Sequence, residues 1–188
     1  KILVTGGAKG VTFECALSLA KRCKAHFILA GRSAHQGIPA WAQGKNRNEL
    51  KAAAIAHLQS MGDKPTPKQV DALVWPVQSS LEISHALQAF EAVGASAEYL
   101  SLDVNNPAAI ASTIAPISAL SPITGIIHGA GVLADKHIQD KTLSELERVY
   151  GTKVTGLNNL LSALDLSQLT LIALFSSAAG FYGNAGQS

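Results

Sequence analysis

A glycine-rich turn near the start of the chain has the residue types and spacing of a phosphate-binding loop. It follows the apolar stretch Ile2–Val4 and contains Thr5, Gly6, Gly7, Lys9, Gly10 and Val11. Small residues let backbone N–H groups approach a pyrophosphate, and the helix expected to begin here directs its positive dipole end at the same charge. The third glycine of the usual spacing is replaced by Thr12. We therefore expect a dinucleotide-binding turn, with a tight turn that holds no ligand as the alternative.

Arg32 and Ser33 follow the second apolar stretch, where an NAD-binding protein usually has an acidic residue for the ribose 2′-hydroxyl. An arginine at this place suits a 2′-phosphate instead, so these residues favour NADP(H) over NAD(H). A solvated arginine at the end of a strand is the alternative interpretation.

Two later apolar stretches also end in residues that a cofactor could contact. These residues are Asp103 and Val104 after one stretch, and His128, Gly129, Ala130 and Gly131 after the other. Doubly wound sheets bind ligands outside the carboxyl ends of their strands, so we expect cofactor contacts here. An alternative to cofactor contact is equally open for two of these residues: Asp103 as a helix cap and His128 as a hydrogen-bonded core residue.

Ser176, Ser177 and Lys153 are the remaining candidates for chemistry. The serine pair ends the last apolar stretch, and Lys153 lies on a helix expected from about Leu143. By themselves, the serines have the character of a helix cap and the lysine that of a solvated surface residue. Whether the serines and Lys153 lie close together depends on the strands and helices that position them.

Strand-like and helical segments alternate along the chain. The expected strands are Ile2–Val4, His26–Ala30, Ala97–Leu102, Ile123–His128 and Leu169–Ser176. This alternation predicts an α/β fold, a Rossmann-like doubly wound parallel sheet with helices on both faces. Capping patterns mark expected helix starts at Asn106–Pro107, Thr142–Glu145 and Ser79–Glu82, and Gly94 marks the end of the helix that starts near Ser80.

Residues 33–79 interrupt this alternation, because a Rossmann unit needs only one helix between its second and third strands. We expect a helical insertion here. The face of its first helix is formed by Leu50, Ala54, Leu58 and Met61. A second, short helix is expected to start at Thr66, Pro67 and Gln69 and to end before Pro76. Two interpretations of the insertion are open: it is a docking surface, or it is an addition to the fold without a function of its own.

The overall composition excludes several classes of protein. With 188 residues, 47% of them hydrophobic and 15% charged, the chain has the character of a globular domain rather than a disordered segment. A net charge of +2 without a basic run speaks against nucleic-acid binding. Cys15, Cys23 and six histidines lack the spacing of metal ligands, and the few cysteines predict a cytoplasmic setting. The apolar runs are too short for a membrane span.

Several motifs carry a resemblance to a known family. In chain order they are VTGGAKGVT, AGRS, LDV, HGAGVLADK, TKVTGLNNL and FSSAAGFYGNAGQ. Together they resemble the ketoreductase domains of polyketide synthases, members of the short-chain dehydrogenase/reductase superfamily, over almost the whole chain except the insertion. With KPTP in that insertion, the chain is most similar to the ketoreductases of bacterial polyunsaturated fatty acid synthases.

The resemblance implies a role for single residues. Ser177 matches the serine that hydrogen-bonds the substrate ketone, and Lys153 matches the catalytic lysine, 24 positions upstream as in ketoreductases. Ser176 and the residues of the turn and strand ends are implied contacts of NADPH, as is Lys153. The proton donor of the family, a tyrosine just beyond Ser188, is not in the sequence, and neither Tyr150 nor Tyr182 matches it. The fragment as given is therefore expected to be inactive.

We thus expect residues 1–188 to form the NADP(H)-binding catalytic subdomain of a ketoreductase, incomplete at its C-terminus. The implied reaction reduces a β-ketoacyl group on an acyl carrier protein to a β-hydroxyacyl group. The implied partners are that carrier protein and other domains of the same synthase, without nucleic acid or membrane. One alternative is a catalytically inactive nucleotide-binding or scaffolding segment of such a synthase. The other is a free-standing short-chain reductase, against which the missing initiator methionine and the position of Lys153 argue.

Overall fold

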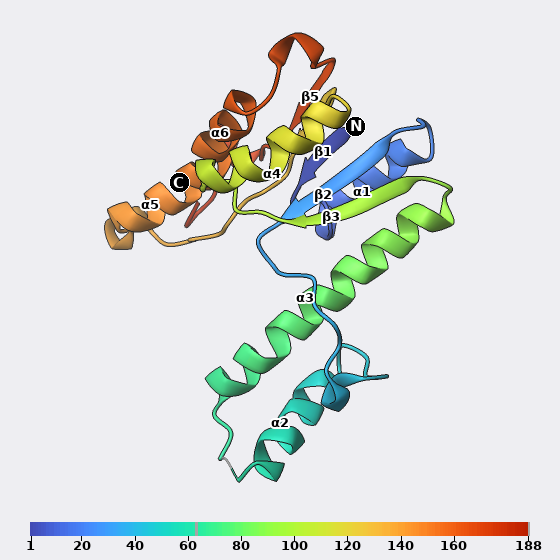
Figure 1. The fold of residues 1–188 in the computed structure, drawn as a ribbon. Helices are drawn as coiled ribbons and strands as arrows, with labels where there is room; N and C mark the ends of the chain where they lie inside the picture. Colours follow the sequence, from blue (N-terminus) through green and yellow to red (C-terminus); the bar gives the residue numbers. More distant parts are fainter. Residues whose placement is uncertain (63, 188) are drawn as a thin grey trace.

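Parallel strands form a single sheet whose carboxyl ends meet along one edge (Figure 1). The structure is a computed structural model that describes residues 1–62 and 64–187. In the order β3-β2-β1-β4-β5, the strands are β3 (Ser96–Ser101), β2 (His26–Gly31), β1 (Ile2–Thr5), β4 (Gly125–His128) and β5 (Leu171–Leu174). The expected Rossmann-like doubly wound fold is confirmed, and each expected strand is present with its ends shifted by at most two residues.

Helices connect the strands and lie on both faces of the sheet (Figure 1). The α-helices are α1 (Gly10–Ala20), α2 (Leu50–Ser60), α3 (Pro67–Ala92), α4 (Pro107–Leu120), α5 (Leu143–Tyr150), α6 (Gly156–Ser162) and α7 (Ala179–Tyr182). Short 3₁₀ turns are η1 (Ala40–Ala42), η2 (Ile138–Asp140) and η4 (Leu166–Gln168). A π-helical turn, η3 (Gly151–Thr155), joins α5 to α6 without a break. The side chains of Asn106 and Thr142 cap α4 and α5 as predicted.

The two faces of the sheet are buried in separate hydrophobic clusters. The face toward α1 and α3 includes Val4, Phe13, Phe27, Leu29, Ala86 and Phe90. The face toward α4 and α6 includes Leu3, Ile28, Ile110, Ile114 and Leu160. Burial on both faces is what a parallel sheet requires, and it explains why β1, β2 and β4 read as continuous apolar runs.

The insertion between β2 and β3 projects beyond the carboxyl edge of the sheet (Figure 1). The expected short helix before Pro76 is wrong, because α3 runs unbroken through Pro76. A proline inside a helix removes a backbone hydrogen bond and costs about 3 kcal/mol. Val74 and Val77, on either side of Pro76, are buried in a cluster with α2, and burying such side chains is worth about 1.5–3 kcal/mol each, which offsets the cost.

The helix start expected at Ser79 is wrong for the same reason. Thr66 begins α3 through a capping box with Gln69, as predicted, so the helix is already formed when the chain reaches Ser79. Ser79 is buried within α3. The helix ends at Ala92, and Gly94 follows with a φ of +73°, which agrees with the predicted stop.

Helix α2 and the first half of α3 enclose a small core of their own. Leu50, Ala54 and Leu58 are buried on one face of α2, as predicted, and pack with the buried valines of α3. Met61 was expected on that face but lies beyond the end of α2 and is exposed. The insertion is therefore a packed unit rather than a loose loop.

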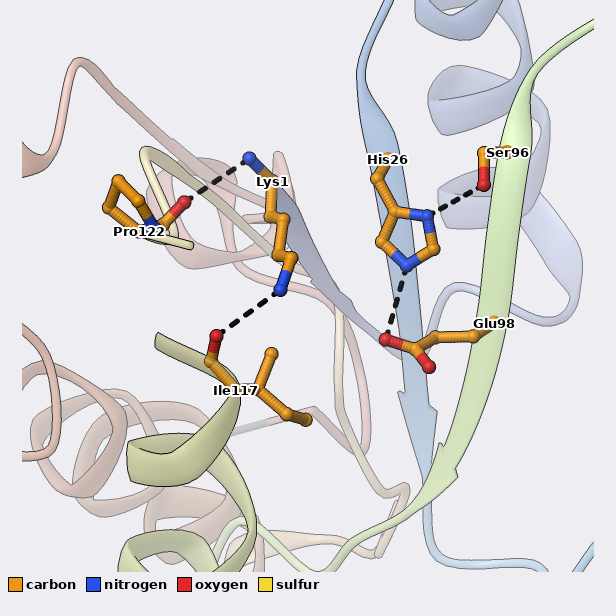
Figure 2. A network of polar contacts seen from close by, with 6 residues as sticks. All are labelled: Lys1, His26, Ser96, Glu98, Ile117 and Pro122. Carbon is orange, nitrogen blue, oxygen red and sulfur yellow. Dashed lines mark hydrogen bonds and ion pairs between the residues drawn. The ribbon is translucent and has the colours of Figure 1, made fainter. Parts of the chain in front are cut away.

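Polar contacts hold the amino edge of the sheet, opposite the edge that doubly wound folds use for ligands (Figure 2). Lys1 Nζ donates to the carbonyl of Ile117 at 3.2 Å. At the start of β2, His26 contacts Ser96 Oγ at 2.8 Å and the Glu98 carboxylate at 3.1 Å, both on β3. The Lys1 bond ties the start of the chain to α4, and the His26 contacts tie the start of β2 to β3.

Thiols and acidic groups are dispersed over the fold. Cys15 is exposed, Cys23 is half-buried, and both are free. Among residues 1–62 and 64–187, no three His, Cys, Asp or Glu side chains gather closely enough to hold a metal ion. In that same part of the chain, no helix combines the length and apolar character needed to cross a bilayer.

Candidate cofactor and catalytic site

A groove of about 500 Å³ lies at the carboxyl edge of the sheet, over the glycine turn. Of the expected cofactor contacts, its walls contain Thr5, Gly6, Lys9, Arg32, Ser33, Val104, Gly129, Ala130 and Gly131. Ligand pockets have volumes of about 300–1,000 Å³. Because β1 lies between β2 and β4, the groove has a β2 end at Arg32 and Ser33 and a β4 end at Gly129–Gly131.

The glycine turn brings main-chain groups to the floor of the groove. Gly6 has a φ of +71°, and a Cβ on it would lie 3.0 Å from the carbonyl of Gly129, so only glycine allows this approach. The side chain of Lys9, the N-cap residue, makes no capping hydrogen bond to the first turn of α1 among the residues that the structure describes, which leaves the N–H groups of this turn for an anion. Gly7 packs beneath the turn, where a Cβ would lie 2.6 Å from Val4 Cγ1. The backbone therefore forms a cradle that a side chain would fill.

Thr12, which replaces the third glycine of the usual spacing, is buried against the loop after β4. A Cβ on Gly129 would overlap the Thr12 hydroxyl and lie 2.5 Å from its Cγ2. Thr12 thus fills space that the missing side chain of Gly129 leaves open. Gly129, in the loop after β4, leaves room for the side chain of Thr12. The turn therefore keeps its shape although the third glycine is replaced by threonine.

The loop after β2 is held at the β2 end of the groove by Tyr99. Its hydroxyl donates to the Ser33 carbonyl at 2.7 Å, and burial raises the pKa of Tyr99, which keeps the phenol protonated. A Cβ on Gly31 would lie 2.9 Å from the Tyr99 hydroxyl oxygen. Arg32 is therefore presented, exposed, on a fixed segment of backbone.

His128, at the end of β4, is buried and joins three segments by hydrogen bonds. Its Nε2 lies 3.0 Å from the Lys153 carbonyl and 3.2 Å from the Thr152 carbonyl, and carbonyls only accept, so Nε2 carries the proton. Nδ1 then accepts the hydroxyl hydrogen of Thr5 at 2.8 Å. Thr5 Oγ1 in turn accepts the Ala130 N–H at 3.2 Å. The structure places His128 as a hydrogen-bonded core residue that fixes the π-helical turn.

Lys153 lies in that π-helical turn, where the helix that begins at Leu143 widens. Such turns are frequent at functional sites. Its Nζ donates to the Phe175 carbonyl at 3.1 Å, just past β5, and lies 3.4 Å from the position of a Cβ on Gly131. Partial burial lowers the pKa of the Lys153 ammonium. Lys153 thus connects the β4 end of the groove to the segment that carries Ser177.

Ser177 is exposed, two residues beyond Phe175. Its Oγ accepts the Ala179 N–H at 3.1 Å, a local cap of the kind that serines commonly make. Acting as an acceptor there leaves its O–H group to donate elsewhere. Tyr182 lies in α7, packs edge-on against Phe181 and is 82% exposed.

The remaining expected contacts do not line the groove. They are Gly7, Gly10, Val11, Asp103, His128, Lys153 and Ser176. Asp103 accepts the Asn105 N–H at 2.9 Å in the turn before α4, and Val11 is 70% exposed on α1. Lys153 lies beside the β4 end rather than in its wall.

Sequence reasoning missed one wall of the groove. Trp75, Ser79, Glu82 and Ile83, all on α3, line it together with Tyr99 and Thr152. The spacing of the α3 residues is that of one helix face, a signal that was available. The local signal of Pro76, which predicts the end of a helix, hides it.

Acidification is expected to destabilise the fold through His128. Burial, and secondly the Lys153 ammonium, lower the pKa of His128 below its ordinary value of 6.5, while the carbonyl hydrogen bonds act in the opposite direction. The unfolded chain then takes up the proton at a higher pH than the folded chain. The free energy of unfolding therefore falls as the pH drops below about 6.5, by at most about 1.4 kcal/mol per pH unit. In urea unfolding at several pH values, His128→Asn should lose less stability on acidification than the wild type; parallel losses would contradict this.

The groups in and beside the groove form a donor set that suits a dinucleotide. Main-chain N–H groups lie at the floor of the groove, a guanidinium stands at its β2 end, and an ammonium lies beside its β4 end. These are donors for a diphosphate, a further phosphate and a sugar hydroxyl.

The sequence profile of the KR domain matches residues 1–188. A protein of the polyunsaturated fatty acid synthase of Thraustochytrium sp. is 38% identical over 197 aligned residues, which cover 100% of this chain and 7% of that protein. The polyketide synthase PksN of Bacillus subtilis is 36% identical over 188 residues, 99% of this chain and 3% of that protein. The chain thus spans a small part of the length of these relatives.

Solved structures show the same architecture. A ketoreductase from the macrolactin assembly line aligns with a TM-score of 0.69 at 27% identity, over 99% of this chain and 30% of that one. NAD⁺-bound xylitol dehydrogenase aligns with a TM-score of 0.64 at 20% identity, over 98% of this chain and 55% of that one, a likeness of fold alone. The KR domain profile matches the full chain, and the relatives of similar sequence are synthases of the same kind; together these matches show the family. The chain belongs to the KR domain family, the ketoreductases of polyketide and polyunsaturated fatty acid synthases.

Proposed function

We propose that this chain is the NADP(H)-binding catalytic subdomain of a ketoreductase that reduces β-ketoacyl groups on an acyl carrier protein to β-hydroxyacyl groups. One observation supports this most: Lys153 binds the segment of Ser177 at the β4 end of a groove whose β2 end carries Arg32. Residues 33–79 are an insertion within this subdomain. The carrier protein and other domains of the same synthase are its partners.

Each part of the site has a distinct task in this reaction. NADPH supplies the hydride when it is bound. The N–H groups of the glycine turn hold its diphosphate, and the loops after β2, β3 and β4 orient its two halves. The Ser177 O–H donates to the ketone oxygen, whose negative charge grows in the transition state, and such aimed donors are the main contribution of the protein. The Lys153 ammonium holds the nicotinamide ribose and lowers the pKa of the proton donor.

Turnover by the synthase tests the proposal. The resemblance implies a tyrosine proton donor beyond Ser188, so the assay uses a synthase polypeptide that extends past this position. It receives NADPH and a β-ketoacyl thioester on the acyl carrier protein, and mass spectrometry identifies the product. A β-hydroxyacyl thioester formed with equal loss of NADPH supports the proposal. Cofactor binding without turnover would contradict it and favour an inactive nucleotide-binding segment.

Arg32→Ala is expected to weaken NADPH binding by about 10- to 100-fold and to leave NADH binding nearly unchanged. A hydrogen bond to a charged group is worth about 1.5–3 kcal/mol, and only NADPH has the 2′-phosphate. Titration calorimetry with both cofactors measures the difference. Arg22→Ala, near the far end of α1, is the matched control. An NADPH preference that survives in Arg32→Ala would show that other groups recognise the phosphate.

A further inference from the structure

Helix α3 adds a side wall to the groove. Its first half projects beyond the carboxyl edge of the sheet (Figure 1). The groove residues on this helix are Trp75, Ser79, Glu82 and Ile83, at positions i, i+4, i+7 and i+8. Such positions share one helix face. The unbroken passage through Pro76 is what brings Trp75 onto the same face as Ile83.

This wall stands at the β2 end of the groove. Ser80 Oγ accepts the Gln36 N–H at 3.0 Å and lies 3.4 Å from the Ala34 carbonyl, which it can donate to. These bonds fasten α3 to the loop that carries Arg32 and Ser33. Since Lys153 lies beside the opposite, β4 end, the proposed function places the adenosine half of the cofactor next to α3.

Trp75 presents an indole at the rim of this end. Its side chain is 58% exposed, although burial of so large an aromatic surface would be favourable. Lys9 Nζ, from the glycine turn, lies 4.9 Å from the ring centroid and 3.6 Å from the Glu82 carboxylate. The lysine thereby spans the distance from the turn to α3. The ammonium thus covers one face of the indole, a cation–π contact, and its charge is paired with Glu82. The opposite face of the ring is the one that a base could stack on, as bases do on aromatic side chains.

We propose that this face of α3 recognises the adenosine half of the cofactor and that the Trp75 indole packs on the adenine ring. The inference rests on the proposed NADPH binding and adds a residue of the insertion to it. Ser79 and Ile83, both buried, form this face of the groove together with Glu82. The insertion then has a task in the site, because α2 braces the segment of α3 that carries Trp75.

Adenosine 2′,5′-bisphosphate is the probe, because it contains the adenosine half and no nicotinamide. Stacking on one base is worth about 1–3 kcal/mol, so Trp75→Ala should weaken the probe by about 5- to 150-fold in calorimetry. Trp75→Phe keeps an aromatic face and should retain most of the affinity. Trp41→Phe is the control, since Trp41 stacks on His57 within the insertion at 5.8 Å and does not line the groove.

Fluorescence gives a second readout that does not depend on activity. The chain has two tryptophans, so Trp41→Phe leaves the emission of Trp75 alone. We expect the probe to quench that emission and to leave the emission of Trp75→Phe unchanged. Equal probe affinity of the wild type and Trp75→Ala, or unchanged Trp75 emission at saturation, would overturn the inference while NADPH binding still stands. Failure of the wild-type chain to bind either the probe or NADPH would overturn the proposed function, and the inference with it.

Discussion

Lys153→Met is expected to lower kcat for ketone reduction by about 10²- to 10⁴-fold in a synthase polypeptide that extends past Ser188. Methionine keeps the length and apolar stem of the side chain and removes only the ammonium group. A cation next to the proton donor lowers the pKa of that donor and makes the proton transfer easier, and transfers of this kind contribute about this factor. The π-helical turn and the bond to the Phe175 carbonyl hold the ammonium in place.

A pH profile separates this role from a merely structural one. The donor must be protonated for reduction, so the alkaline limb of the kcat profile reports its pKa. Without the cation that pKa rises, and the limb should move to higher pH as the rate falls. Lys153→Arg keeps the positive charge and should recover part of the rate.

Lys51→Met is the matched control for Lys153→Met. Lys51 is exposed on α2, pairs with Asp71 at 3.1 Å and lies outside the groove, so its replacement should leave kcat unchanged. Circular dichroism and NADPH titration check that the Lys153 variants fold and bind. A Lys153→Met enzyme with a normal kcat and an unshifted pH profile would remove Lys153 from the proposed mechanism.

The central part of the fold could be predicted because local and long-range signals agree there. The apolar runs of β1, β2 and β4 end in glycines or polar residues, and burial on both faces leaves such runs few other choices. The end of the second helix in the insertion could not be predicted by local rules. Pro76 signals a break, but the burial of Val74 and Val77 beside it outweighs that signal. Only the packing of α2 on α3 decides the outcome.

The candidate site also has a part that the sequence predicts and a part that depends on tertiary packing. Residues after the strands could be assigned to one edge because parallel strands place their carboxyl ends together. The sequence left open whether His128 faces a ligand or the core, and the answer depends on the π-helical turn that accepts its Nε2–H. The position of Lys153 depends on the same turn. The α3 wall was missed because it exists only if the helix passes through Pro76.

Gly129→Ala is expected to lower the free energy of unfolding by about 1–3 kcal/mol and to weaken NADPH binding by about 10-fold. The new methyl group would overlap the side chain of Thr12, which is buried, β-branched and fixed in the first turn of α1. To relieve the clash between the new methyl group and Thr12, α1 must move away from the loop after β4. Gly6 contacts the Gly129 carbonyl, so this shift would also distort the cradle for the diphosphate. Urea unfolding and NADPH titration measure the two effects.

Thr12→Gly should rescue Gly129→Ala, because it restores a glycine at the usual third position and clears the space for the new methyl group. Thr12→Gly alone leaves a void and a glycine inside α1, and should cost about 1 kcal/mol or more. The double variant should therefore be more stable than the sum of the single losses predicts, with a coupling energy of about 0.5–3 kcal/mol. Gly37→Ala, in open space with an ordinary backbone, is the control and should change stability by less than about 0.5 kcal/mol. Additive losses in the double variant would mean that Thr12 and Gly129 do not share the space, and that the threonine is tolerated at the turn for another reason.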